Sequence, residues 1–320
     1  MSVFFATISA FMLSVMSIFF HTAPPQEIPE SVKQVEGDVV IVKGLATLPH
    51  TKESRVPKRR DIWEPPGTED ITAESYVIMD SRTGEILYSR SPNKIWPAAS
   101  ITKLMTAIIS HDALEEDNVQ LTDEIIITSK DDAEGTRYIY EGESVEIQDI
   151  YRAMLIGSIN SFAQTLMRAS EKEQEEFINR MNEKARRFGL WNTHFDDVTG
   201  LSEGNTITAK EGAWLLKEAL EYPIIQDALL RSEYTFETKN TRRSISIKNT
   251  NRLLESGYRI EGGKTGHIEV AKYNFAVRIG NNLGDSILIV VLGSDTEETR
   301  FSDTSDLAEW TFTNYEWQPL

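Results

Sequence analysis

Three short motifs follow one another along this chain, and together they predict acyl transfer on a serine. They are Ser100-Ile-Thr-Lys103, Ser158-Ile-Asn160 and Lys264-Thr-Gly266. In this order they supply a nucleophile with its base, a proton relay and a clamp for a carboxylate. Each motif is weak alone, so the prediction depends on finding all three in contexts that suit these roles.

The first motif falls in a predicted helix, with Pro97 as its first helical residue. Apolar residues at 101, 104, 105, 108 and 109 have the spacing of a buried face. Ser100 and Lys103 are one turn apart, so their side chains should point the same way along one edge of that face. Burial there lowers the pKa of a lysine, and a neutral lysine can take the serine proton.

The second motif follows a helical stretch, 150–156, that Gly157 interrupts. Ser158 and Asn160 are therefore expected in a tight loop between two helices. A hydroxyl and an amide in such a loop can relay a proton to a leaving amine and hold a substrate carbonyl.

The third motif follows Glu261-Gly-Gly263 and leads into a strand-like segment. Lys264 and Thr265 on an edge strand can bind the terminal carboxylate of a peptide. Gly266 leaves room for a substrate strand to lie alongside, in the manner of β-augmentation.

Strand patterns stand at both ends of this region, with a mostly helical middle. Segments 76–79 and 85–88 predict one hairpin, and 273–279 with 286–292 predict a second strand pair. A helical pattern over 177–188 ends at Gly189 as a C-cap. This order predicts an α/β sandwich in which a mainly antiparallel sheet is covered by helices.

Composition excludes several other classes of function. The 320 residues carry 33 basic and 50 acidic side chains, for a net charge of −17, which argues against a nucleic-acid partner. Cysteine is absent, so thiolate chemistry and disulfides are excluded. The five histidines lack metal-ligand spacing, so neither a metal site nor a cofactor is expected.

The N-terminal segment 1–20 is predicted to be a membrane anchor or a signal segment. Val3–Phe20 carries no charge and as a helix would be about 27 Å long, enough to cross the hydrocarbon layer. We favour an anchor with the rest of the chain on the extracytoplasmic side; cleavage would make the protein secreted.

Residues 21–69 hold seven of the eleven prolines and predict a stiff linker, whose Lys-Arg-Arg at 58–60 is solvated or touches head groups. Residues 70–320 form the predicted catalytic domain.

From about Ala73 to Trp317 the chain resembles the D-alanyl-D-alanine carboxypeptidases among the low-molecular-mass penicillin-binding proteins. Outside the motifs, the resemblance includes Tyr76–Asp80, Asn192–Phe195, Thr199–Leu201, Asn249–Asn251 and Tyr273–Phe275. It implies a β-lactamase/penicillin-binding-protein transpeptidase-like fold, with the active site in a cleft between the α/β sandwich and a helical sub-region.

The resemblance also implies a role for each site residue. Ser100 would be the nucleophile, Lys103 its base and Ser158 the proton relay. The backbone N–H groups of Ser100 and His267 would form the oxyanion hole, so the His267 side chain is not the base. The substrate-binding residues would be Asn160, Lys264, Thr265, Gly266 and His267.

The implied substrate is a peptidoglycan stem peptide ending in D-Ala-D-Ala, and β-lactams would be covalent inhibitors. A D,D-endopeptidase acting on cross-links and a peptidoglycan-binding scaffold without turnover remain alternatives. A β-lactamase ranks low, because the chain has no Glu-x-x-Leu-Asn segment.

The chain departs from the family pattern in three places, at Ile159, at Asp197-Val198 and at Ser161-Phe162. These departures bear on pocket shape and rate rather than on the class of reaction. Many members of the family also carry a C-terminal β-rich domain and an amphipathic anchor, whereas this chain ends with the catalytic domain. The N-terminal segment would then provide membrane attachment.

Overall fold

The computed structural model describes residues 41–42, 45–46, 57–61, 65–66, 70–131, 138–170 and 173–317. The chain divides into two compact units, Met1–Glu53 and Ser54–Leu320. In the first unit, the described residues form one antiparallel pair, β1 (Ile41–Val42) with β2 (Leu45–Ala46). The predicted anchor, 1–20, lies outside the described residues and stays a prediction. None of the described helices is long and apolar enough to cross a membrane.

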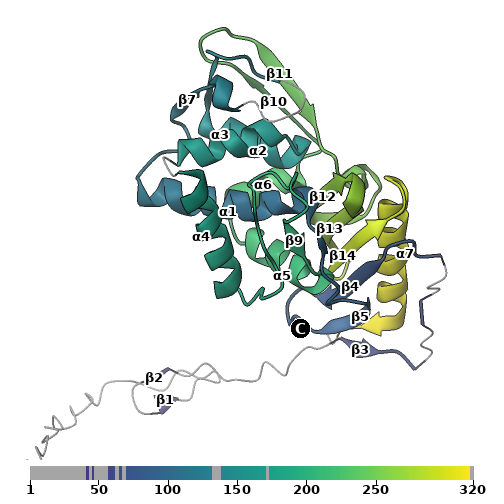
Figure 1. The fold of residues 1–320 in the computed structure, drawn as a ribbon. Helices are drawn as coiled ribbons and strands as arrows, with labels where there is room; N and C mark the ends of the chain where they lie inside the picture. Colours follow the sequence, from purple (N-terminus) through teal and green to yellow (C-terminus); the bar gives the residue numbers. More distant parts are fainter. Residues whose placement is uncertain are drawn as a thin grey trace, which may run out of the picture. The chain divides into compact units, whose positions relative to one another are not determined.

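The second unit is built on a five-stranded antiparallel sheet with the order β12-β13-β14-β4-β5 (Figure 1). Its strands are β4 (Ser75–Asp80), β5 (Ile86–Arg90), β12 (Arg259–Ile268), β13 (Lys272–Gly280) and β14 (Ser286–Ser294). Both predicted strand pairs are confirmed, since β4 pairs with β5 and β13 with β14. Segments far apart in the sequence thus meet in the middle of the sheet, where β14 pairs with β4.

Both faces of the sheet are buried, each against its own hydrophobic core. Successive side chains along a strand point alternately into one core and the other. In β4, Val77 and Met79 belong to the core shared with the helical region, whereas Tyr76 and Ile78 belong to the core on the opposite face. Helix α5 (Ala209–Ala219) packs against the first face of the sheet and α7 (Thr299–Asn314) against the second. The predicted α/β sandwich is therefore confirmed.

A helical region lies beside the sheet (Figure 1). Its helices are α1 (Thr102–Glu116), α2 (Ile147–Gly157), α3 (Asn160–Ala169), α4 (Gln174–Arg187) and α6 (Pro223–Leu230). Short strand pairs accompany them, namely β6 (Trp96–Pro97) with β9 (Thr206–Ile207), β7 (Glu124–Ile126) with β8 (Ser144–Glu146), and β10 (Glu233–Glu237) with β11 (Ser244–Lys248). The predicted helix before Gly189 is confirmed as α4, and Gly189 has a φ of 76°.

The predicted start of the first helix was wrong. Pro97 lies in β6 opposite Thr206, and the N–H of Ala98 donates to the main-chain oxygen of Asn205. The chain is therefore still extended at Pro97. A 3₁₀ turn, η1 (Ala99–Ile101), then carries the chain into α1.

The prediction that Ser100 and Lys103 point the same way is confirmed, because Lys103 Nζ lies 2.9 Å from Ser100 Oγ. The burial of α1 extends beyond the predicted apolar face. Helix α1 packs against α2, α3, α4 and α5, so every residue from 102 to 110 is buried. The polar members of this stretch need partners inside the protein, and Thr106 donates to the main-chain oxygen of Val198 at 2.6 Å.

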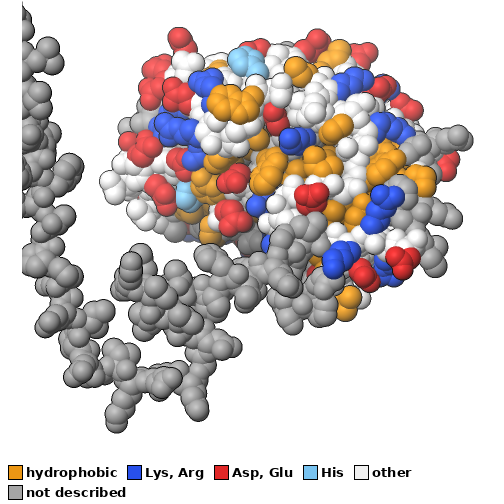
Figure 2. Space-filling model, turned by 90° about the horizontal axis from the view of Figure 1, so that it is seen from below, with side chains coloured by type: hydrophobic (Ala, Val, Ile, Leu, Met, Phe, Trp, Pro, Cys, Tyr) orange, Lys and Arg blue, Asp and Glu red, His pale blue; other side chains and the backbone are white. Residues whose placement is uncertain are grey.

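The segment before residue 70 adds a strand to the second unit. β3 (Lys58–Arg59) pairs with β15 (Tyr315–Glu316), and the N–H of Arg60 donates to the main-chain oxygen of Asn314. The side chains of the basic triplet are exposed, as predicted. The face shown in Figure 2 carries basic and acidic side chains interspersed over its surface.

Candidate active site

A cleft of about 250 Å³ gathers most of the residues that the three motifs contribute. Ser100 reaches it from η1, Ser158 and Asn160 from the α2–α3 junction, and Thr265 and Gly266 from β12. His267 also lines the cleft, whereas Lys103 and Lys264 lie fully buried beneath its floor. The structure therefore brings all eight predicted site residues together.

The amine of Lys103 makes three hydrogen bonds. Its Nζ lies 2.9 Å from Ser100 Oγ, 2.7 Å from Asn160 Oδ1 and 2.6 Å from the main-chain oxygen of Thr199. The two carbonyl oxygens can only accept, so Nζ donates to both of them. A neutral amine then has its lone pair left to accept the proton of Ser100, which is the arrangement a base needs.

Burial lowers the pKa of Lys103 from 10.5 to about 7, against the opposing effect of the negative charge on Asp197. The side chain is fully buried, and the carbonyl groups around it do not neutralise a positive charge. A base with a pKa near neutrality can both take and return a proton at physiological pH.

Ser158 is held by the second lysine of the site. Gly157 is the last residue of α2, and Ser158 follows in the left-handed conformation with φ 58°. Lys264 Nζ donates to Ser158 Oγ at 2.7 Å and to the main-chain oxygen of Thr265 at 3.0 Å. Burial holds the pKa of Lys264 well below its usual value, and the charges on Lys103 and Arg300 lower it further.

Two glycines allow separate segments to approach the Ser100 turn. A Cβ on Gly200 would lie 2.0 Å from the main-chain oxygen of Ala99, and the φ of Gly200 is +87°. A Cβ on Gly266 would lie 3.2 Å from the main-chain nitrogen of Ser100. Glycine at both positions thus lets the turn at residues 196–205 and strand β12 pack close to Ser100.

The cleft is also lined by two hydroxyl groups and a cation. Thr250 Oγ1 and Thr265 Oγ1 are 2.6 Å apart, and both residues line the cleft. Arg300 lines the same cleft from α7 and donates to Glu297 Oε1 at 3.0 Å. Its buried Nε has no hydrogen-bond partner among the described residues.

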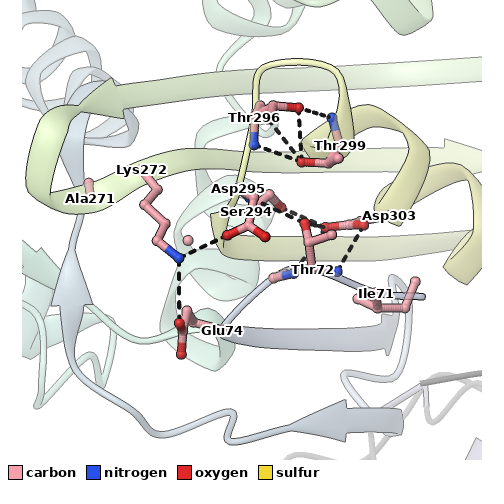
Figure 3. A network of polar contacts seen from close by, with 12 residues as sticks. Ile71, Thr72, Glu74, Ala271, Lys272, Ser294, Asp295, Thr296, Thr299 and Asp303 are labelled. Carbon is pink, nitrogen blue, oxygen red and sulfur yellow. Dashed lines mark hydrogen bonds and ion pairs between the residues drawn. The ribbon is translucent and has the colours of Figure 1, made fainter. Parts of the chain in front are cut away.

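The imidazole of His267 is fixed by its neighbours. Its Nδ1 lies 2.9 Å from the main-chain oxygen of Lys272, and the ring stacks on Tyr273 with centroids 4.2 Å apart. A carbonyl only accepts, so Nδ1 carries a proton. The Lys272 side chain lies between Glu74 and Asp295, as Figure 3 shows, and its Nζ is 3.6 and 2.9 Å from their carboxylate oxygens. Among the described contacts, no hydrogen bond joins the His267 imidazole to Ser100.

Ile159 points away from the cleft. Its side chain is 6% exposed and belongs to the core of the helical region. A Cβ on Gly157 would lie 3.0 Å from Ile159 Cδ1 and 2.6 Å from Ile247 Cγ2, so Ile159 and β11 both pack against the end of α2. The expectation that Ile159 shapes the pocket therefore has no support in this geometry.

Sequence analysis missed several residues that the structure places in or around the site. Thr250 and Arg300 line the cleft, and Thr199 contributes a main-chain oxygen rather than a side chain. Asn274, fully buried on β13, donates to the main-chain oxygens of Pro97 and Ala98 and accepts from a main-chain N–H of β14. Thr250 and Asn274 lie in segments that resemble the family, and that resemblance was the available signal for them.

Comparison with known proteins gives this site a context. A sequence profile of the D-alanyl-D-alanine carboxypeptidase family, peptidase S11, matches residues 62–296. The chain belongs to this family. The expected family is thereby confirmed, and the match covers all three motifs of the candidate site.

Individual relatives in the family carry two kinds of name. The chain is 29% identical over 256 residues to the D-alanyl-D-alanine carboxypeptidase DacF of Bacillus subtilis, covering 78% of this chain and 64% of that one. It is 29% identical over 250 residues to a D-alanyl-D-alanine endopeptidase of Pseudomonas aeruginosa, covering 77% and 79%. The chain thus spans less than two thirds of the Bacillus subtilis relative.

Solved structures agree with the fold. Penicillin-binding protein 5 of Haemophilus influenzae superimposes with a TM-score of 0.71 at 26% identity, covering 79% of this chain and 73% of that one. The predicted penicillin-binding-protein transpeptidase-like fold is therefore confirmed.

Proposed function

We propose that this protein is a serine-type D-Ala-D-Ala carboxypeptidase that trims the terminal D-alanine from peptidoglycan stem peptides. The observation that carries the proposal is the position of Lys103 Nζ, 2.9 Å from Ser100 Oγ with its two other contacts on carbonyl oxygens. In this environment the lysine serves as the base for an otherwise unreactive hydroxyl.

In the acylation step, Ser100 Oγ attacks the carbonyl carbon between the two D-alanines while its proton passes to Lys103 Nζ. The tetrahedral oxygen that forms would be held by the main-chain N–H groups of Ser100 and His267. Asn160 offers its Oδ1 to Lys103, so its amide NH₂ group is directed to other acceptors, such as a substrate carbonyl.

In the next step the carbon–nitrogen bond breaks and the leaving amine takes the proton that Lys103 received from Ser100, which leaves Lys103 neutral again. Ser158 Oγ, which accepts from Lys264 at 2.7 Å, would pass that proton to the amine. Water then attacks the acyl-serine ester, giving a proton to Lys103, and the Ser100 oxygen leaves with a proton returned by the same lysine. The products are free D-alanine and a shortened stem peptide, and Ser100 is regenerated.

The terminal carboxylate would bind beside Thr265, with Thr250 and Arg300 also lining the cleft. Lys264, the other residue predicted to hold the carboxylate, does not line the cleft and donates to Ser158 Oγ. A threonine hydroxyl donates to the carboxylate, and Arg300 supplies a positive charge close by. Charge-assisted contacts of this kind favour a free C-terminus over an internal peptide bond.

A D,D-endopeptidase acting on cross-links is the second candidate. Relatives from Pseudomonas aeruginosa and Escherichia coli are named D-alanyl-D-alanine endopeptidases, and the chain covers 79% and 77% of their lengths. This coverage exceeds the 64% of the carboxypeptidase DacF. The same serine, base and relay would serve both reactions.

The test is release of D-alanine by the full chain from a peptide ending in D-Ala-D-Ala, with Ser100→Ala as the control. Release that is lost in the variant supports the carboxypeptidase. Cleavage of a D-Ala cross-linked dimer without release from the monomer would favour the endopeptidase. Acylation of Ser100 without turnover of either substrate would favour the peptidoglycan-binding scaffold.

We further propose that β-lactams acylate Ser100 and that residues 1–20 anchor the protein with its catalytic domain on the extracytoplasmic side. The proposal on β-lactams depends on the same nucleophile and base, and the proposal on the anchor depends on the uncharged stretch Val3–Phe20. Labelling of the protein with a fluorescent penicillin tests acylation of Ser100. For the anchor, alkaline extraction of membranes and sequencing of the mature N-terminus distinguish an anchor from a cleaved signal.

A further inference from the structure

The turn formed by residues 196–205 packs directly on the segment that carries the nucleophile and its base. Within it, residues 198–200 make successive contacts with η1 and α1. The main-chain oxygen of residue 198 accepts from Thr106 Oγ1 at 2.6 Å, and that of residue 199 accepts from Lys103 Nζ at 2.6 Å. Gly200 then lies against the main chain of Ala99. Any movement of this turn would therefore move a hydrogen-bond partner of the base.

The carboxylate of Asp197 holds this turn together from the inside. Its Oδ1 accepts from the N–H of Thr199 at 2.5 Å, from the Thr199 hydroxyl at 2.9 Å and from the N–H of Gly200 at 2.6 Å. Its Oδ2 accepts from the N–H of Ser202 at 2.6 Å. An aspartate that accepts from main-chain N–H groups a few residues further on fixes the local backbone.

The far side of the turn is braced by Asn205. Its Oδ1 accepts from the N–H groups of Asp196 and Asp197, and its Nδ2 donates to Thr102 Oγ1 at 3.0 Å. Asn205 is fully buried, so this second clamp joins the turn to the first residue of α1. Hydrogen bonds of Asp197 therefore hold this turn together, and those of Asn205 join it to the helix that contains Lys103.

Asp197 also acts on Lys103 through its charge. Two effects act on the pKa of Lys103, namely burial, which lowers it, and the negative charge of Asp197, which raises it. The carboxylate favours the ammonium form of Lys103, whereas burial favours the neutral amine. The balance between them sets how much neutral base is present at a given pH.

We propose that Asp197 is a positioning residue for acylation, which fixes the Thr199 carbonyl on Lys103 and by its charge sets the acidic limit of activity. This inference rests on the proposed function, because it assumes that Lys103 is the base for Ser100. It adds a residue outside the three motifs to the machinery of that reaction.

The test is the pH dependence of acylation of the full chain by a fluorescent penicillin, in the wild type and in Asp197→Asn. Asparagine keeps Oδ1 as the acceptor for Thr199 and Gly200 but loses the charge and the acceptor for Ser202. The acidic limb of the acylation profile should move to lower pH by about one unit, the lower end of what a neighbouring charge does. The rate on the plateau should fall, because the turn is held by fewer contacts.

Asp196→Asn is the matched control. Asp196 carries the same charge one residue away, but its carboxylate contacts two side chains, the exposed His194 at 2.8 Å and the Ser202 hydroxyl at 3.4 Å, rather than the N–H groups of Thr199 and Gly200. Its acidic limb should coincide with that of the wild type. An Asp197→Asn limb that coincides with the wild type, or an equal movement in both variants, would overturn the role of the Asp197 charge.

A second variant separates positioning from charge and decides the case if Asp197→Asn does not fold. Asp197→Glu keeps the charge but has one more methylene, so its oxygens cannot reach the same N–H groups. Its acidic limb should stay in place while the plateau rate falls about tenfold or more, as expected when a reacting group is misplaced. A plateau rate within twofold of the wild type would overturn the positioning role.

The failure of this inference can be told apart from that of the proposed function. A wild type that is acylated but releases no D-alanine from the peptide argues against the carboxypeptidase and leaves the penicillin profile usable. A wild type that releases D-alanine, with unchanged profiles in both Asp197 variants, keeps the carboxypeptidase and rejects the role of Asp197.

Discussion

The Nζ atom of Lys103 lies 2.6 Å from the main-chain oxygen of Thr199, a residue 96 positions further along the chain. Together with Asn160 Oδ1, this oxygen takes both N–H groups of a neutral amine and turns its lone pair toward Ser100. The active state of the base is therefore supported by a main-chain group, which no substitution of the Thr199 side chain removes.

Replacing Lys103 with methionine should strongly slow acylation and make the free energy of unfolding less dependent on pH. Loss of a general base lowers the acylation rate by about 10²- to 10⁴-fold. The folded-state pKa of Lys103, about 7, lies below its usual 10.5. Between these values the unfolded chain binds one more proton, so wild-type stability from this group rises with pH.

Thermal unfolding at two pH values checks the second part of that prediction. The unfolding temperature of Lys103→Met relative to the wild type should be higher at pH 6 than at pH 9.5, because the buried charge is present only at the lower pH. Other effects of the substitution, such as the loss of the hydrogen bonds to the Asn160 and Thr199 oxygens, are the same at both pH values. An equal difference at the two pH values would mean that Lys103 keeps its ordinary pKa in the folded protein.

Gly200→Ala should be far more damaging than Gly142→Ala. Both glycines have positive φ, +87° and +86°, so each substitution places a Cβ in the left-handed region at about 1–2 kcal/mol. A Cβ at residue 200 would also meet the main-chain oxygen of Ala99 at 2.0 Å, whereas residue 142 has nothing within 4 Å. We expect Gly200→Ala to lower the free energy of unfolding by about 4 kcal/mol or more, or to slow acylation by displacing the Ser100 turn. Denaturant unfolding measures the free energy of unfolding, and penicillin labelling measures the acylation rate. Equal values for the two variants would contradict the close approach of residue 200 to Ala99.

The Thr250 hydroxyl should help to bind the substrate carboxylate by orienting Thr265. Thr250→Val removes the 2.6 Å contact between the two hydroxyls while keeping the shape of the side chain. A neutral hydrogen bond contributes about 1 kcal/mol, so KM for the D-Ala-D-Ala peptide should rise about fivefold with little change in kcat. Thr250→Ser keeps the hydroxyl and should restore KM. Equal KM values for the Thr250→Val and Thr250→Ser variants would show that the Thr250 hydroxyl does not contribute to substrate binding.

Ile159→Ala should affect stability rather than substrate binding. The side chain is buried in the core of the helical region, so its truncation should lower the free energy of unfolding by about 2–4 kcal/mol. KM for the peptide should stay within about twofold of the wild type, because the side chain does not line the cleft. A large change in KM at unchanged stability would instead place Ile159 in the substrate pocket.

Local patterns in the sequence were sufficient for the elements and for the reacting side chains. The two strand pairs and helix α4 follow from alternation and from 3.6-residue periodicity, which depend only on neighbouring residues. The three motifs identified Ser100, Lys103 and Lys264 because their spacing within a turn or a strand is itself local. The start of α1 was misplaced because Pro97 pairs with Thr206, a residue more than a hundred positions away.

Only the tertiary structure decided how deeply the base is buried and what surrounds it. Lys103 was expected at the edge of one apolar face. Four other helices pack against α1, and the Lys103 side chain is fully buried. The turn that carries Asp197 and Thr199, the hydroxyl of Thr250 and the cation of Arg300 reach the cleft from elements whose own patterns say nothing about it. The sequence by itself determined which groups could react, because their chemistry resides in single residues. Their pKa values and their alignment depend on burial and on contacts between distant segments, so the packing of the chain set them.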